Sequence, residues 1–74
     1  MAHDIPPLAW LRAFESAARH RNFTLAATEL GLTPAAVSYQ VRALEELLGY
    51  PLFERKTRPM AMTTMGALYV PWVT

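Results

Sequence analysis

Cysteine is absent from the 74 residues, and this absence excludes two classes of small domain. Without thiols the chain has neither a disulfide framework nor a thiolate metal site, so zinc-finger architectures are ruled out. The two histidines, His3 and His20, belong to no plausible arrangement of ligands, acids or nucleophiles. We therefore predict no catalytic residues, no metal site and no cofactor.

Long apolar runs are missing as well. No stretch approaches the roughly 20 apolar residues of a membrane-spanning helix. The first residues also lack the basic segment followed by an apolar segment that typifies a secretory signal. These features predict a cytoplasmic protein that does not insert into membranes.

Net charge is small but unevenly placed. The formal value is +1, so no global positive field indicates nucleic acid by itself. Three basic residues nevertheless crowd into positions 55–58, whereas Glu29, Glu45 and Glu46 lie elsewhere. This placement predicts a lopsided field with its positive side near residues 55–58.

The chain contains enough apolar material for one small packed domain, because 53% of its residues are hydrophobic. After Pro6 and Pro7, which can begin a helix, residues 8–20 show a helical pattern. The expected buried face of this helix carries Leu8, Leu11, Phe14 and Ala18.

Residues 24–49 contain two further helical patterns separated by a tight turn. The first is expected to run from an N-cap at Thr24 to a left-handed C-cap at Gly31. The second begins with Thr33 as N-cap and Pro34 as first helical residue, and Gly49 ends it. Its buried stripe recurs at steps of four, three and four residues: Val37, Val41, Leu44 and Leu48. This arrangement is typical of a helix-turn-helix.

The opposite face of the second motif helix carries small and hydrogen-bonding side chains, namely Ala35, Ser38, Tyr39 and Arg42. A helix that enters the major groove must be slim at its tip and must offer hydrogen-bonding groups to bases. It also gains from N-terminal amides that lie near a phosphate. The pattern favours DNA recognition, and the alternative is the solvent-facing side of an ordinary amphipathic helix.

Residues 52–62 predict a β-hairpin. Leu52–Glu54 and Met60–Met62 are expected to pair antiparallel around a basic tip at residues 56–59. Beside a recognition helix such a hairpin is a wing, since arginine can enter the narrow minor groove and nearby cations can neutralise phosphates. A solvated charged turn is the alternative.

The last residues predict a further helix and an unpaired apolar surface. Thr63 or Thr64 is expected to cap a helix through Met65–Tyr69, which Pro71 interrupts. The apolar residues that follow predict either a continuation of the chain or a pairing surface.

The order of these features resembles the N-terminal DNA-binding domain of the LysR-type bacterial transcriptional regulators. The resemblance runs from about Leu8 to Gly66, and residues 33–38 are most similar to the branch that contains the glycine-cleavage activator. It rests on the following residues: Phe14, Phe23-Thr24-x-Ala26-Ala27-x-x-Leu30, Ala36-Val37-Ser38-x-Gln40-Val41, Leu44-Glu45, Leu48-Gly49, Leu52-Phe53-x-Arg55, Arg58 and Thr63-x-x-Gly66.

The resemblance implies a mainly α winged helix-turn-helix with a three-helix core, a β-hairpin wing and the start of a linker helix. Residues 24–30 and 34–48 would be the motif helices. Residues 1–62 would form the DNA-binding domain, and residues 63–74 would begin the helix that pairs two subunits.

The resemblance also implies a set of DNA-binding residues, carried over by position. Base-edge contacts fall to the start of the second motif helix, Arg42 reaches phosphate or base, and Arg58 on the wing enters the minor groove. The full set is Thr33, Pro34, Ala35, Ser38, Tyr39, Arg42, Arg55, Lys56 and Arg58. Many relatives have Gln-Pro in place of Pro34-Ala35 and Arg in place of Tyr39. These departures leave the base preference open, since tyrosine cannot make arginine's bidentate guanine contact.

The implied partners are double-stranded DNA and a second subunit. The family implies a homodimer on an inverted repeat, a tetramer in a full-length form, and a small-molecule effector bound by a C-terminal domain that these 74 residues do not contain. The predicted function is therefore sequence-specific DNA binding within a transcription regulator and not enzyme catalysis. The alternative is a winged-helix module that binds another protein.

Overall fold

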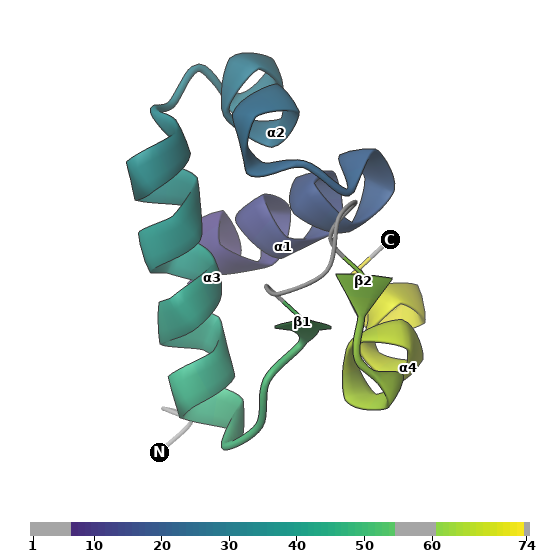
Figure 1. The fold of residues 1–74 in the computed structure, drawn as a ribbon. Helices are drawn as coiled ribbons and strands as arrows, with labels where there is room; N and C mark the ends of the chain where they lie inside the picture. Colours follow the sequence, from purple (N-terminus) through teal and green to yellow (C-terminus); the bar gives the residue numbers. More distant parts are fainter. Residues whose placement is uncertain (1–6, 55–60, 74) are drawn as a thin grey trace.

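The computed structural model describes residues 7–54 and 61–73, and within them the chain forms four helices and one two-stranded sheet (Figure 1). The elements are, in order, α1 (Leu8–His20), α2 (Phe23–Leu30), α3 (Pro34–Leu48), β1 (Phe53–Glu54), β2 (Ala61–Met62) and α4 (Thr64–Val73). The predicted mainly α fold, with a three-helix core followed by a hairpin, is confirmed. The predicted wing tip lies outside the described residues.

Helix α1 is the centre of the packing, because it contacts α2, α3 and α4. Figure 1 shows α3 along one side of the domain and α4 on the other, with the hairpin strands between them. The core contains alanine and larger apolar side chains from every described element except β2 and α4: Ala13, Phe14, Ala17, Ala18, Ala26, Ala27, Val37, Val41, Leu44, Leu52 and Phe53. The many alanines let the three core helices approach closely.

The buried face of α1 differs from the predicted one. Phe14 and Ala18 are buried as expected, but Leu8 is 61% exposed. The buried side chains are instead Ala13, Phe14, Ala17 and Ala18, together with Ser16. The prediction followed the largest apolar residues, whereas close packing of helices selects the small ones.

Helix α2 begins earlier than predicted, so Thr24 is not its N-cap. Asn22 takes that role: its backbone is extended, and its Oδ1 accepts a hydrogen bond from the Leu25 amide at 2.9 Å. Thr24 lies inside the first turn, where its carbonyl accepts from the Thr28 hydroxyl. The other end is as predicted, with Gly31 in the left-handed region at φ 70°.

Both predicted ends of α3 are confirmed. Thr33 Oγ1 accepts from the Ala36 amide at 3.1 Å, Pro34 occupies the first turn, and Gly49 closes the helix with φ 87°. Val37, Val41 and Leu44 are fully buried, and Leu48 is half-buried at the end of the same stripe.

The hairpin and α4 are joined through Thr63, one of the two predicted caps. Strands β1 and β2 pair antiparallel, with Phe53 opposite Met62 and Glu54 opposite Ala61. Thr63 Oγ1 accepts from the Gly66 amide at 3.0 Å and donates to the Pro51 carbonyl at 2.8 Å. The same side chain therefore caps α4 and ties it to the segment before β1.

Pro71 does not interrupt α4, contrary to the sequence prediction. The helix runs from Thr64 to Val73 and contains Pro71 near its end. Proline's fixed φ is compatible with helical backbone, and at this position the missing N–H removes only one bond of the last turns. Helix α4 therefore continues beyond Tyr69, where the sequence pattern predicted its end.

Aromatic rings connect the elements around the core. The Phe14 ring lies 5.4 Å from Phe53 and 5.6 Å from Tyr69, centroid to centroid. Phe23 meets Phe53 edge to face at 6.0 Å. Such tilted pairs add to the burial of apolar area. Phe53 therefore links β1 to α1 and α2, and Phe14 links α1 to α4.

A polar cluster joins α1 to α2 around the Glu29 carboxylate. Glu29 Oε1 accepts from the buried Ser16 hydroxyl and from Arg19 Nη2 at 2.9 Å, and lies 3.1 Å from His20 Nε2. The Arg19 hydrogen bond, reinforced by Ser16, lowers the pKa of Glu29 from its ordinary 4.5 to about 2. Arg19 also binds Glu15 through two bonds of 2.9 Å and lowers the pKa of that carboxyl.

A close approach between the backbones of Gly66 and Leu52 predicts a stability effect at Gly66. A Cβ at this position would lie 2.1 Å from the Leu52 carbonyl oxygen, which is backbone and cannot swing away. We expect Gly66→Ala to destabilise the domain by roughly 1–3 kcal/mol through overpacking. Thermal unfolding followed by circular dichroism measures the change.

Gly31→Ala is the matched control, because a Cβ there meets nothing within 4 Å and only the positive φ of 70° is unfavourable. Its expected cost is about 1 kcal/mol. If Gly66→Ala unfolds no earlier than Gly31→Ala, the close contact between α4 and Leu52 is wrong.

The depressed pKa of Glu29 predicts acid sensitivity. Its contribution to stability is complete above the unfolded value of about 4.5 and is lost as the pH falls toward about 2. The effect is modest, since 39% of the side chain is exposed and water screens the ion pairs. We expect the unfolding temperature to fall between these pH values, and Glu29→Gln to flatten that fall.

Glu46→Gln serves as control for this titration, because Glu46 is exposed and forms no ion pair within the described residues. It should leave the pH dependence of the wild-type protein intact. Equal flattening by both variants would mean that the cluster around Glu29 does not stabilise the fold.

Candidate nucleic-acid interface

Helix α3 presents an open edge on the side opposite its buried stripe. Ala35, Tyr39 and Arg42 are exposed and recur at steps of four and three residues, so they share one side of the helix. Tyr39 is 67% exposed, an unusual position for so large an aromatic ring. The edge is small at its N-terminal end and carries hydrogen-bonding groups one and two turns later.

The N-terminal end of α3 is held in place by the turn before it. Gly31 in its left-handed conformation lets the Leu32 amide bond back to the Ala27 carbonyl at 2.9 Å. Thr33 then satisfies the Ala36 amide, and Pro34 has none to satisfy. Within the described residues the Ala35 amide has no acceptor, so a donor points outward at the tip of the helix.

Six of the nine predicted DNA-binding residues lie together at this end of the domain. Thr33, Pro34, Ala35, Tyr39 and Arg42 are exposed, and Ser38 is half-buried at the border between the open edge and the core. The structure does not describe Arg55, Lys56 or Arg58, so their place relative to this edge stays a prediction. The helical part of the predicted site is therefore one continuous surface.

Arg42 and Tyr39, on the open edge of α3, are free to meet a ligand. Within residues 7–54 and 61–73, Arg42 forms no ion pair, and neither Arg42 nor Tyr39 forms a side-chain hydrogen bond. Arg19 differs, since two carboxylates bind it. A phosphate can therefore pair with Arg42 without breaking a contact inside the domain.

Glu45, which the sequence reasoning did not assign to any function, connects α3 to the hairpin. The residue is only 9% exposed, and its Oε2 accepts from the amides of Leu52 and Phe53 at 2.8 and 3.3 Å. A signal was available, because position 45 follows Val41 by four residues and so falls on the buried stripe of α3. A carboxylate at a buried position needs donors, and the next loop supplies them.

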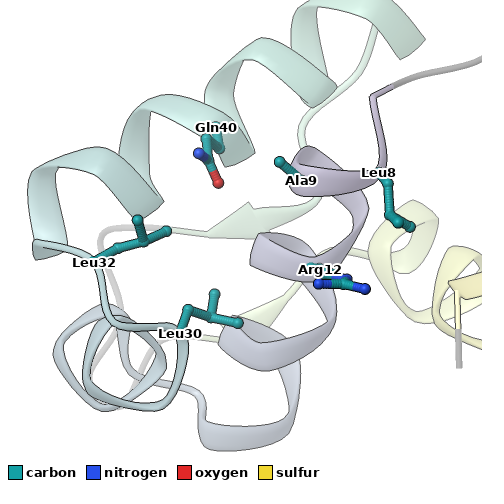
Figure 2. Close-up of a pocket in the computed structure, with 6 residues that line it drawn as sticks. All are labelled: Leu8, Ala9, Arg12, Leu30, Leu32 and Gln40. Atoms are coloured by element: carbon teal, nitrogen blue, oxygen red, sulfur yellow. The ribbon is translucent and has the colours of Figure 1, made fainter.

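A second surface feature is an apolar groove between α1 and the beginning of α3, shown in Figure 2. Its volume is about 250 Å³, and the lining side chains are Leu8, Ala9, Arg12, Leu30, Leu32 and Gln40. The Gln40 Oε1 atom is buried there without a hydrogen-bond partner among the described residues. Gln40 lies about 100° around the helix from Tyr39, so the groove and the open edge are separate surfaces.

Within the described part of the chain, no group of three or more histidine or carboxylate side chains is placed to hold a metal ion. None of the helices that the structure describes has the length and apolarity needed to span a membrane.

Residues 8–67, which run from the start of α1 into α4, match the family described as bacterial regulatory helix-turn-helix proteins of the lysR family. The chain belongs to this family. The resemblance inferred from the sequence is therefore confirmed, and so is the winged-helix fold class, because the structural neighbours are LysR DNA-binding domains.

The similar curated proteins include transcriptional activators. Over 69 residues the chain is 49% identical to the glycine cleavage system transcriptional activator of Escherichia coli K12. It is 52% identical to the homologue of that activator in Haemophilus influenzae. Each match covers 93% of this chain and 23% of the relative. The chain thus spans about a quarter of the length of these relatives.

The similar solved structures include LysR-family regulators in complex with DNA. The DNA-binding domain of BenM with its benA site has a TM-score of 0.87 and 34% identity, covering 90% of this chain and 75% of that one. DarR of Vibrio fischeri with DNA has a TM-score of 0.87 and 33% identity, covering 90% and 23%.

Proposed function

We propose that this chain binds double-stranded DNA with sequence preference, as the DNA-binding domain of a bacterial transcription regulator. The observation that carries the proposal is the open edge of α3, whose exposed groups have no partners within the described residues. Relatives of the same fold bound to DNA support it.

The dimensions of α3 suit the major groove. The groove is about 12 Å wide, and a helix with its side chains is about 10–12 Å across. Only a helix with a slim leading end enters deeply, and α3 has Pro34 and Ala35 there. Its outward Ala35 amide and the helix dipole both favour a phosphate at this end.

Each residue of the edge has a distinct proposed role. Ala35 permits close approach and can contact a thymine methyl, while Ser38 donates to or accepts from a base edge. Tyr39 offers one hydrogen bond and an apolar ring face. Arg42, two turns into the helix, reaches phosphate or base. Because Tyr39 has a single donor, we infer that it reads bases less stringently than an arginine.

The hairpin completes the proposed interface as a wing. Arg58 would enter the minor groove, and Arg55 and Lys56 would neutralise phosphates. The proposal further includes a homodimer on an inverted repeat, since a two-fold protein matches a two-fold site. Leu68 on α4 is 62% exposed and offers apolar area for such pairing.

The larger regulator is also part of the proposal. The curated relatives are named as transcriptional activators and are about four times as long as this chain, so we assign effector binding and tetramer formation to regions outside it. Chromosomal DNA in bacteria is cytoplasmic, and the proposal places the protein there. Relatives that regulate transcription support a binding protein and not an enzyme.

A protein-interaction module is the second candidate, and the groove of Figure 2 is the observation that favours it. The two candidates differ in salt dependence. DNA binding through Arg42 and Arg58 releases counterions, so replacing either residue should make the fall of affinity with salt shallower. An unchanged slope supports the interaction module.

Selection from a randomised duplex pool at physiological salt tests the proposed function. We expect the bound fraction to become enriched in an inverted repeat whose half-sites lie about one helical turn apart. Enrichment of single half-sites would support reading by α3 without pairing. A pool that stays random would contradict sequence-specific binding by this chain.

Two matched variants assign roles within the selected sequence. Tyr39→Ala should change the preferred base at one position of each half-site, with a cost of roughly 1–3 kcal/mol on the original site. Lys56→Ala should weaken all sequences alike and lower the salt slope by about 1. If Tyr39→Ala also acts uniformly, Tyr39 does not read bases.

A further inference from the structure

We infer that Glu45 is a positioning residue for the wing: its buried carboxylate in α3 fixes the start of β1, so that the wing's grip on DNA depends on it. The inference rests on the proposed function, because it assigns to α3, the proposed recognition helix, the second task of holding the wing in place. Glu45 itself touches no DNA in this account and acts only through the hairpin.

The hydrogen bonds of Glu45 clamp the loop between α3 and β1 at both ends. Its backbone carbonyl accepts from the Gly49 amide at 2.8 Å and closes the helix. Its side chain turns the other way, and the single atom Oε2 accepts from Leu52 and Phe53. Both ends of the loop therefore bind Glu45, and the bonds to Leu52 and Phe53 are the ones that depend on its side chain.

The clamp is needed because the loop ends inside the core. Leu52 is fully buried and Phe53 is 3% exposed, so water does not reach their amides freely. Without an acceptor these two N–H groups would be buried and unsatisfied. A carboxylate makes stronger hydrogen bonds than a neutral group, and the amides in turn compensate its burial.

The position of Leu52 and Phe53 then determines the rest of the hairpin. The Leu52 carbonyl accepts from the Thr63 amide at 2.9 Å, and Phe53 pairs with Met62. Both strands are therefore held in register from the two residues that Glu45 binds. Residues 55–60 start from Glu54, the end of β1, so α3 determines the point from which the wing leaves the domain.

Three substitutions separate the parts of this interaction. Glu45→Gln keeps an oxygen at the same reach, and one amide oxygen can still accept both bonds. Glu45→Met keeps the length and apolar stem of the side chain but removes the acceptor. Glu45→Asp keeps the charge but withdraws it by one methylene. Affinity is measured on a short duplex with an A·T-rich tract, below the unfolding temperature of each variant.

The expected results form a double-mutant cycle with Arg58→Ala. In the wild-type background Arg58→Ala should weaken binding about ten-fold. Glu45→Met should cause a similar loss, and adding Arg58→Ala to it should cost less than two-fold more, because the wing is already misplaced. Glu45→Gln, which keeps an acceptor oxygen, should lose less affinity than Glu45→Met. Tyr39→Ala should cost the same factor in both backgrounds, which a general loss of structure would not allow.

Amide hydrogen exchange gives a readout that does not involve DNA. Leu52 and Phe53 should exchange faster in Glu45→Met and Glu45→Asp than in wild type and Glu45→Gln, while Val41 stays protected. If Glu45→Met does not fold, Glu45→Asp takes its place in the cycle with the same expected coupling.

Two outcomes overturn the inference. The first is a full ten-fold effect of Arg58→Ala in the Glu45→Met or Glu45→Asp background, and the second is unchanged exchange at Leu52 and Phe53. If Arg58→Ala alone leaves the DNA affinity unchanged, the proposed wing contact itself is wrong. That failure is distinct, because the exchange measurement still decides whether Glu45 holds β1.

Discussion

Burial of Leu52 and Phe53 in the core is the contact on which the rest of the domain depends. The Phe53 ring lies within 6.0 Å of both Phe14 and Phe23, so it closes the core of three helices. The backbone around Leu52 receives Thr63 and comes so close to Gly66 that a methyl group would not fit. The end of α3, the hairpin and α4 therefore meet at two residues.

Helix α3 must serve the core and a ligand at the same time, and its charges are divided accordingly. Its buried side carries Val37, Val41 and Leu44, and its outer edge carries the exposed side chains that we propose to meet DNA. Of the two carboxylates of α3, Glu45 is buried and holds the hairpin, whereas Glu46 is exposed. Arg42 is left without an internal ion pair among the described residues, so a chain of net charge +1 still offers an uncompensated cation at the edge.

The sequence alone predicts most of the fold, because periodicity and caps are local. Thr33, Pro34 and Gly49 identify α3 to the residue, and the first helix has the predicted bounds. One of the errors is tertiary in origin, and the other two concern local features of the chain. Leu8 is exposed since alanines form the helix contact, Asn22 replaces Thr24 because its backbone is extended, and α4 tolerates Pro71. The exposed edge of the site follows from the same periodicity, whereas the bonds of Glu45 depend on where the next loop returns.

An NMR titration of the labelled chain with a selected duplex tests the central claim, that α3 enters DNA by its open edge. We expect the largest amide shifts to fall on residues 33–42, with Ala35, Tyr39 and Arg42 foremost. Shifts centred on Leu8, Leu30 and Leu32, which line the groove of Figure 2, with the edge of α3 unperturbed, would contradict it.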